Sequence, residues 1–172
     1  MPNVSDSPVR PQTTGTADTR PSTAGTAVSD PSGRPAAYVS RDLRLDAELH
    51  PGGSPRTPTI MLGRVQGDVD ARSAADFRAW CAGAADPGPL VLDLSDVTFL
   101  GVAGLSALVD LAHDLRRRGV DWAVAAQARA VLRPLAVSGL PDLVPVHPTV
   151  RAAMDSLTGP RPESSAAGDP RG

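Results

Sequence analysis

The chain has 172 residues, of which 41% are hydrophobic and 3% aromatic, and its 17 basic and 19 acidic residues give a formal net charge of -2. This length accommodates one compact domain of roughly 100 to 150 residues and little more. The near balance of charge argues against a basic nucleic-acid groove or a polybasic membrane patch, so neither nucleic acid nor a membrane surface is an expected partner.

Every basic residue apart from histidine is an arginine, which excludes chemistry that depends on a lysine, such as a P-loop or a Schiff base. The single cysteine, Cys81, fits a reducing compartment. The first residues have neither a basic nor an apolar signal region, and no stretch approaches the ~20 apolar residues of a membrane span. We therefore expect a cytoplasmic protein without membrane insertion.

Both ends of the chain have the composition of disordered segments. Residues 1–37 are more than half Pro, Gly, Ser and Thr, and residues 159–172 are similar. Such segments bury too little apolar area to offset the conformational entropy lost on ordering, about 1 to 2 kcal/mol per residue. The composition predicts two disordered tails flanking one folded domain over residues 38–158.

The first half of this domain alternates between strand and helix patterns. Val39–Leu49 and Thr59–Gln66 are predicted strands, separated by a loop rich in turn residues, and the apolar run Leu90–Leu94 is typical of a buried central strand. Between the last two, a helix is expected to begin after Asp70 or Ser73 and to end near Ala82. Its predicted inner face holds Ala74, Phe77 and Cys81.

The clearest helix is predicted over Val102–Arg118. Its apolar residues follow a helical period and are expected to face the core: Val102, Leu105, Leu108, Val109, Ala112 and Leu115. Gly119 can adopt the left-handed conformation that ends a helix. The three arginines before it interact favourably with the negative end of the helix dipole. At the other end, Gly101 takes the place of the usual polar capping residue, and no side chain there can accept a proton or a phosphate.

The second half continues the alternation. Val120–Ala126 and Leu143–His147 are predicted strands, and Ala128–Ser138 and Thr149–Leu157 are predicted helices, with Pro134 expected to kink the first of these helices or to delay its start. Strands joined through helices are parallel neighbours, while the first two strands can form a hairpin. The predicted fold is α/β, a small mixed sheet with packed helices.

No catalytic or metal-binding pattern stands out. Asp93 ends a strand in VLDLSD, but the second acid needed for a phosphatase site is displaced by one position, and we interpret Asp93 as a hydrogen-bonding strand-end carboxylate. The three histidines, at 50, 113 and 147, lack metal-ligand spacing, and Cys81 lies on an inner helix face. We expect no enzyme activity, no metal and no cofactor.

Several segments taken together resemble the STAS domain of bacterial anti-sigma factor antagonists. They are GDVD at 67–70, LVLDLSDVTFL at 90–100, VAGLSALVDL at 102–111, RRRGVDWAVA at 116–125 and VLRPLAVSGL at 131–140. The similarity covers about residues 43–157. It implies a non-catalytic binding module whose partner is an anti-sigma factor and serine kinase of the histidine-kinase-like ATPase class, so that it regulates sigma-factor-dependent transcription. The resemblance also leaves room for a homodimer.

The chain departs from this family at the phosphoacceptor. Where the family has an acid followed by a serine, this sequence has Gly101 and Val102, so the usual phosphate switch cannot operate at Val102. Nearby hydroxyls that could substitute as phosphorylation sites are Ser95, Thr98 and Ser106.

By this resemblance the partner would bind one surface of the domain. Its expected residues are Asp68, Asp70, Thr98, Phe99, Leu100, Gly101, Val102, Ala103, Gly104, Leu105, Ser106 and Asp110. On it, Val102 either adds apolar contact area or turns inward. The alternative function is that of a STAS scaffold subunit in a larger signalling or lipid-transport assembly.

Overall fold

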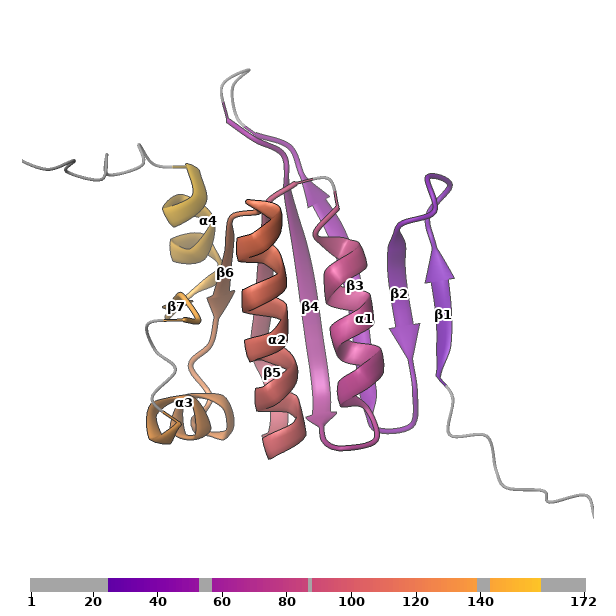
Figure 1. The fold of residues 1–172 in the computed structure, drawn as a ribbon. Helices are drawn as coiled ribbons and strands as arrows, with labels where there is room; N and C mark the ends of the chain where they lie inside the picture. The colour runs from indigo at the N-terminus through magenta and orange to yellow at the C-terminus, as the bar shows by residue number, and fades with distance from the viewer. Residues whose placement is uncertain (1–24, 53–56, 87, 139–142, 159–172) are drawn as a thin grey trace, which may run out of the picture.

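The computed structural model describes residues 25–52, 57–86, 88–138 and 143–158. Within these ranges the chain forms a seven-stranded sheet with helices packed on it (Figure 1). The strands are β1 (Thr26–Ser29), β2 (Pro35–Val39), β3 (Leu43–His50), β4 (Ile60–Val69), β5 (Leu90–Leu100), β6 (Trp122–Ala125) and β7 (Val146–His147). The helices are α1 (Ala74–Ala84), α2 (Val102–Arg118), α3 (Arg129–Val137) and α4 (Val150–Thr158).

The strands lie in the sheet in their order along the chain, from β1 to β7. The pairs from β1 to β4 are antiparallel, and those from β4 to β7 are parallel. This arrangement confirms the predicted hairpin of β3 and β4 and the predicted parallel strands joined through helices. The fold is the expected mixed α/β type.

The prediction of a disordered N-terminal tail over residues 1–37 is wrong for its last part. β1 pairs with β2 from Thr26 opposite Val39, and β2 in turn pairs with β3. Tyr38 anchors this addition, because its ring is buried and its hydroxyl donates a 2.6 Å hydrogen bond to the Asp76 carboxylate on α1. The rest of that predicted tail, residues 1–24, and the predicted tail at 159–172 lie outside the described residues.

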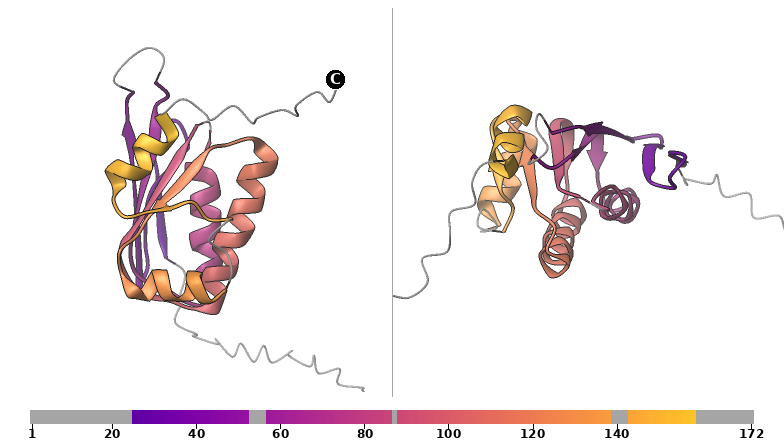
Figure 2. Two further views of the ribbon diagram at one scale, coloured as in Figure 1. Left: turned by 90° about the vertical axis from the view of Figure 1, so that its left-hand side faces the viewer. Right: turned by 90° about the horizontal axis from the view of Figure 1, so that it is seen from above.

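Helices cover both faces of the sheet (Figure 2). α1 and α2 lie side by side on one face, over the larger core, which includes Phe77, Leu92 and Leu108. α4 packs on the opposite face, over a smaller core that includes Ala153, Leu62 and Val91. No helix in the described ranges is long and apolar enough to cross a membrane.

The inward face of α2 differs from the predicted one, although its bounds are those predicted and Gly119 ends it at φ 67°. Val102 is not on the buried face: it is 83% exposed. The residues that α2 buries are Gly104, Ala107, Leu108, Leu111, Ala112 and Leu115. The alternative in which Val102 turns inward is therefore wrong.

Other boundaries differ by a few residues. β5 continues to Leu100, six residues beyond the predicted end, because its ladder with β4 extends through two irregularities as far as Val69 opposite Leu100. β6 and β7 are shorter than predicted. Pro134 lies inside α3, which starts one residue later than expected, at Arg129.

Candidate functional site

The expected partner-binding residues lie at one end of the sheet. β4 and β5 run parallel, so both strands finish at this end, and α2 begins directly after β5 (Figure 1). α3 lies at the same end and packs against β5. The residues that the sequence places around positions 68–70 and 98–106 are therefore brought together by the fold.

A glycine turn positions the end of β4. Gly67 has φ 97°, a conformation that favours glycine, and a Cβ at this position would collide with the backbone carbonyl of Asp42. The same carbonyl accepts a 2.8 Å hydrogen bond from the backbone N–H of Asp68. This contact fixes the direction in which Asp68 leaves the strand.

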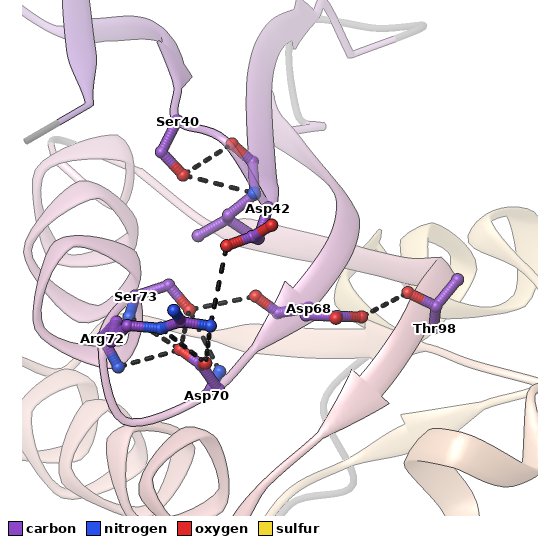
Figure 3. Close-up of polar contacts among 8 residues, drawn as sticks. Ser40, Asp42, Asp68, Asp70, Arg72, Ser73 and Thr98 are labelled. Carbon is purple, nitrogen blue, oxygen red and sulfur yellow. Dashed lines mark hydrogen bonds and ion pairs between the residues drawn. The ribbon is translucent and has the colours of Figure 1, made fainter. Parts of the chain in front are cut away.

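Asp68 connects the ends of β4 and β5 with the start of α1 (Figure 3). Its carboxylate accepts a 2.5 Å hydrogen bond from the Thr98 hydroxyl, and its backbone carbonyl accepts a 2.9 Å hydrogen bond from the Ser73 hydroxyl. Ser73 is buried, and its oxygen also accepts from the backbone N–H of Asp70 at 3.0 Å. Asp68, Asp70 and Thr98 therefore belong to one hydrogen-bonded unit.

Asp70 closes the turn that precedes α1. Its carboxylate accepts hydrogen bonds from the backbone N–H groups of Arg72 at 2.8 Å and Ser73 at 3.2 Å. The Arg72 guanidinium lies 3.1 Å from Asp70 and 3.7 Å from Asp42. The hydrogen bond from the Arg72 backbone, helped by the guanidinium, lowers the pKa of the Asp70 carboxyl below its ordinary value of 3.8, so this part of the surface stays anionic at neutral pH.

Two glycines set how α2 begins. Gly101 is the N-cap residue and provides no side-chain cap, while its backbone N–H donates to the Val69 carbonyl at 3.0 Å. Gly104 is buried, and a Cβ there would come within 2.6 Å of the same carbonyl oxygen. The absence of side chains at these positions allows α2 to start directly against the end of β4.

The surface around the start of α2 is apolar. Val102, 83% exposed, and Val137 at the end of α3, 82% exposed, are the two most exposed large apolar side chains of the described residues, and Phe99 is 52% exposed. The Phe99 ring lies against Gly101, where a Cβ would be 3.0 Å from its Cε1 atom. The ring and Val102 thus flank the helix start.

The other expected contact residues divide by burial. Thr98, Ser106 and Asp110 are exposed, Ala103 and Leu105 are half-buried, and Leu100 and Gly104 are buried. We expect the two buried residues to support the surface rather than to contact a partner. Asp110 lies about two turns along α2, 3.9 Å from the Arg78 guanidinium of α1.

The hydroxyls expected as substitute phosphorylation sites differ in their surroundings. Ser95 is exposed on β5, and its backbone N–H donates to the Asp93 carboxylate at 3.1 Å. The Thr98 hydroxyl is held by Asp68, and Ser106 is exposed on α2. The Ser95 contact also confirms Asp93 as a hydrogen-bonding strand carboxylate.

The structure also places Cys81 and the side chains that could bind a metal. Cys81 is completely buried on α1, and desolvation raises the pKa of its thiol, so the unreactive protonated form persists. Among the described residues, no group of three or more His, Cys, Asp or Glu side chains is placed to hold a metal ion.

Sequence reasoning missed the contribution of α3 to this surface. A groove of about 390 Å³ lies between the end of β5 and α3, with Phe99 on one side and Pro134 and Val137 on the other. Arg129 and Arg133 of α3 also line it. The available signal was the pair of arginines, Arg129 and Arg133, within the apolar segment RAVLRPLAV.

Comparison with known proteins gives a consistent result. The family model of the STAS domain matches residues 54–153. The anti-sigma-F factor antagonist RsfA of Mycobacterium tuberculosis is 34% identical over 105 residues, which cover 57% of this chain and 80% of RsfA. The crystal structure of an anti-sigma factor antagonist from Mycobacterium paratuberculosis superimposes with a TM-score of 0.56 and 26% identity, covering 67% of this chain and 95% of that one.

Proposed function

Because this chain belongs to the STAS domain family, we propose that it is an anti-sigma factor antagonist, a non-catalytic module that binds an anti-sigma factor. The relative from Mycobacterium tuberculosis is named for antagonism of an anti-sigma-F factor, and it matches over most of its own length. The partner surface, as we define it, consists of the exposed and half-buried residues among those expected at 68, 70, 98–106 and 110.

The exposure of Val102 carries the proposal. This valine is 83% exposed at the first residue of α2, where the family resemblance places the phosphoacceptor serine. An apolar side chain at the centre of an interface contributes contact area without the desolvation cost of a charge. An apolar side chain at this exposed position contributes nothing to the core of the domain, and it is thus suited to contact with a protein partner.

Polar groups beside Val102 support the same surface. The Asp68 carboxylate holds the exposed Thr98 hydroxyl, and Asp70 is kept anionic by the turn before α1. Such groups at the rim of an apolar centre are typical of protein interfaces, where they contribute to specificity.

The absence of a hydroxyl at Val102 implies that binding is not ended by a phosphate there. A phosphoserine would add about -1.5 to -2 charges at the start of the helix, and valine cannot gain them. We infer that the partner is an anti-sigma factor of the histidine-kinase-like ATPase class and that the complex persists in the presence of ATP.

The test is a binding assay with the full-length chain immobilised. Purified anti-sigma factors encoded in the same genome are passed over it with and without ATP and Mg²⁺, and the chain is then examined for phosphate by mass spectrometry. We expect one of them to bind with the same Kd in both conditions and to leave the chain unmodified.

One variant on the partner surface and one matched control sharpen this test. Val102→Asp places a charge at the apolar centre and is expected to weaken binding at least tenfold, a loss typical of a central interface residue. Val28→Asp, a matched change at a 53% exposed valine on β1, is expected to bind like the wild type.

The contrary outcomes are distinct. Equal binding by Val102→Asp and the wild type would remove this position from the interface. Recovery of only transporter or scaffold subunits from a native extract would favour the scaffold alternative. Phosphate on Ser95, Thr98 or Ser106 after incubation with the partner and ATP would contradict constitutive binding and place the switch at another hydroxyl.

A further inference from the structure

We propose that the groove between β5 and α3 receives an acidic amphipathic segment of the anti-sigma factor, an inference that rests on the proposed function. An apolar side chain of that segment fills the space between Phe99 and Val137, and its carboxylates pair with Arg129 and Arg133. The partner surface therefore extends from the start of α2 onto α3.

The apolar part of the argument comes from exposure. Val137 is 82% exposed at the C-terminal end of a nine-residue helix, and Phe99 is 52% exposed at the end of β5. Together with Pro134 they line a groove of about 390 Å³, large enough for an aliphatic or aromatic side chain. Exposed apolar groups gathered beside a hollow are typical of a binding site.

The groove is continuous with the apolar start of α2. The Phe99 ring lines the groove and also lies against Gly101, which directly precedes Val102. A side chain at position 101 would approach within 3.0 Å of the ring and compete with it for this place. Gly101 therefore permits one apolar strip from Val102 across Phe99 to α3, so a partner seated on Val102 can reach the groove.

Charge indicates which segment would bind. Arg129 and Arg133 are exposed and make no ion pair with any described residue, unlike Arg117, Arg118 and Arg151, which pair with acids on their own helices. A spacing of four residues places Arg129 and Arg133 on the same side of α3, with their Cβ atoms about 6 Å apart. Two carboxylates one helical turn apart on a partner helix have the same separation and the opposite charge.

The test compares three variants for binding to the anti-sigma factor selected by the assay above. Val137→Asp and the double variant Arg129→Glu/Arg133→Glu are each expected to weaken binding about tenfold or more, as for residues near the centre of an interface. Raising the salt concentration is expected to weaken binding by the wild type and to reduce the difference in Kd between the wild type and the double variant. Because the changed side chains are exposed, thermal unfolding should remain close to that of the wild type.

Matched controls lie elsewhere on the molecule. Arg151→Glu reverses an exposed charge on α4, and Val28→Asp repeats the valine change on β1; both are expected to bind within twofold of the wild type. A partner variant with Glu→Arg at the facing position is expected to restore binding to the double arginine variant.

The outcomes separate this inference from the proposed function. If no anti-sigma factor binds the wild type, both are overturned. If the wild type binds, Val102→Asp binds weakly and the groove variants bind within twofold of the wild type, the antagonist function stands and the groove proposal is overturned. Conversion of a dimer to a monomer by Val137→Asp, measured by light scattering, would identify a second copy as the occupant and would also overturn it.

Discussion

Replacing Gly104 by alanine tests the close contact between α2 and β4. In an ordinary helix interior this change stabilises a protein by up to about 1 kcal/mol, because glycine is a poor helix former. Here the new Cβ would lie 2.6 Å from the Val69 carbonyl oxygen and 2.8 Å from Leu100 Cδ1. The nearest atom is backbone that already accepts a hydrogen bond from Gly101, so it cannot rotate away.

The expected result of Gly104→Ala is a loss of stability. Overpacking a buried site costs typically 1 to 3 kcal/mol, and the backbone contact places this case at the upper end. Subtracting about 1 kcal/mol for the better helix propensity of alanine leaves a net loss of about 2 kcal/mol. For a chain of this size that loss lowers the Tm by roughly 8 °C.

Chemical denaturation and calorimetry measure this loss directly. Ser106→Ala is the matched control, because it introduces alanine two residues further along the same helix at an exposed position. The control should be as stable as the wild type or slightly more stable. Equal or greater stability of Gly104→Ala relative to the wild type would refute the close approach of α2 to Val69 and the reasoning built on it.

Three further predictions concern the neighbouring groups. Ser73→Ala should lower the free energy of unfolding by about 1 to 3 kcal/mol, measured by urea titration, because it removes the hydroxyl partner of the Asp68 carbonyl and of the Asp70 N–H in this half-buried turn; unchanged stability would argue against these two hydrogen bonds. The Cys81 thiol, buried with a raised pKa, should react with Ellman's reagent only after unfolding, and rapid labelling of the native chain would contradict its burial. The pKa of Asp70 is lowered in the folded state, so its ionised form stabilises the fold above pH 3.8, and this contribution is lost as the pH falls through the lower folded value. The difference in free energy of unfolding between the wild type and Asp70→Asn, measured by denaturation from pH 7 to pH 2, should therefore shrink only at the acid end.

Sequence patterns predicted α2 well because its signals are local. The apolar period and the left-handed stop at Gly119 define its length, and both ends match. The error at Val102 arose because the apolar pattern assigned this valine to the inner face of α2 and did not assign Gly104 to it. In the structure Gly104, without a side chain, is the residue that faces Val69, and this rotates Val102 into solvent.

The strands at the N-terminus were missed because their stabilising contacts are not local. Thr26–Ser29 is exposed throughout and contains one large apolar residue, so composition alone indicates disorder. Its order comes from pairing with β2, which the buried Tyr38 fixes to α1. A turn signal was nevertheless present: the Asp30 carboxylate accepts the backbone N–H groups of Ser32 and Arg34 at 2.8 and 2.9 Å.

The candidate site was predicted from the ends of two strands and the start of α2, and the structure adds α3 to it. The sequence identified residues near 68–70 and 98–106 because they follow predicted strands and resemble a family motif. The groove with α3 joins Phe99 to Val137, 38 positions apart, and arises from the packing of α3 on β5. No periodic pattern in either segment indicates that contact.

The order of the strands has a consequence for how the chain can be assembled during synthesis. Since the strands from β1 to β7 lie in the sheet in the order in which they are made, each new strand joins at the outer edge, and none must insert between two that have already paired. The edge of β4 that pairs with β5 stays unpaired only while α1 and its flanking turns are synthesised. Their synthesis takes about one to four seconds at typical rates of translation. The sheet can thus grow in one direction as the polypeptide leaves the ribosome, and the binding end near α2 and α3 is complete before β7 and α4 are added.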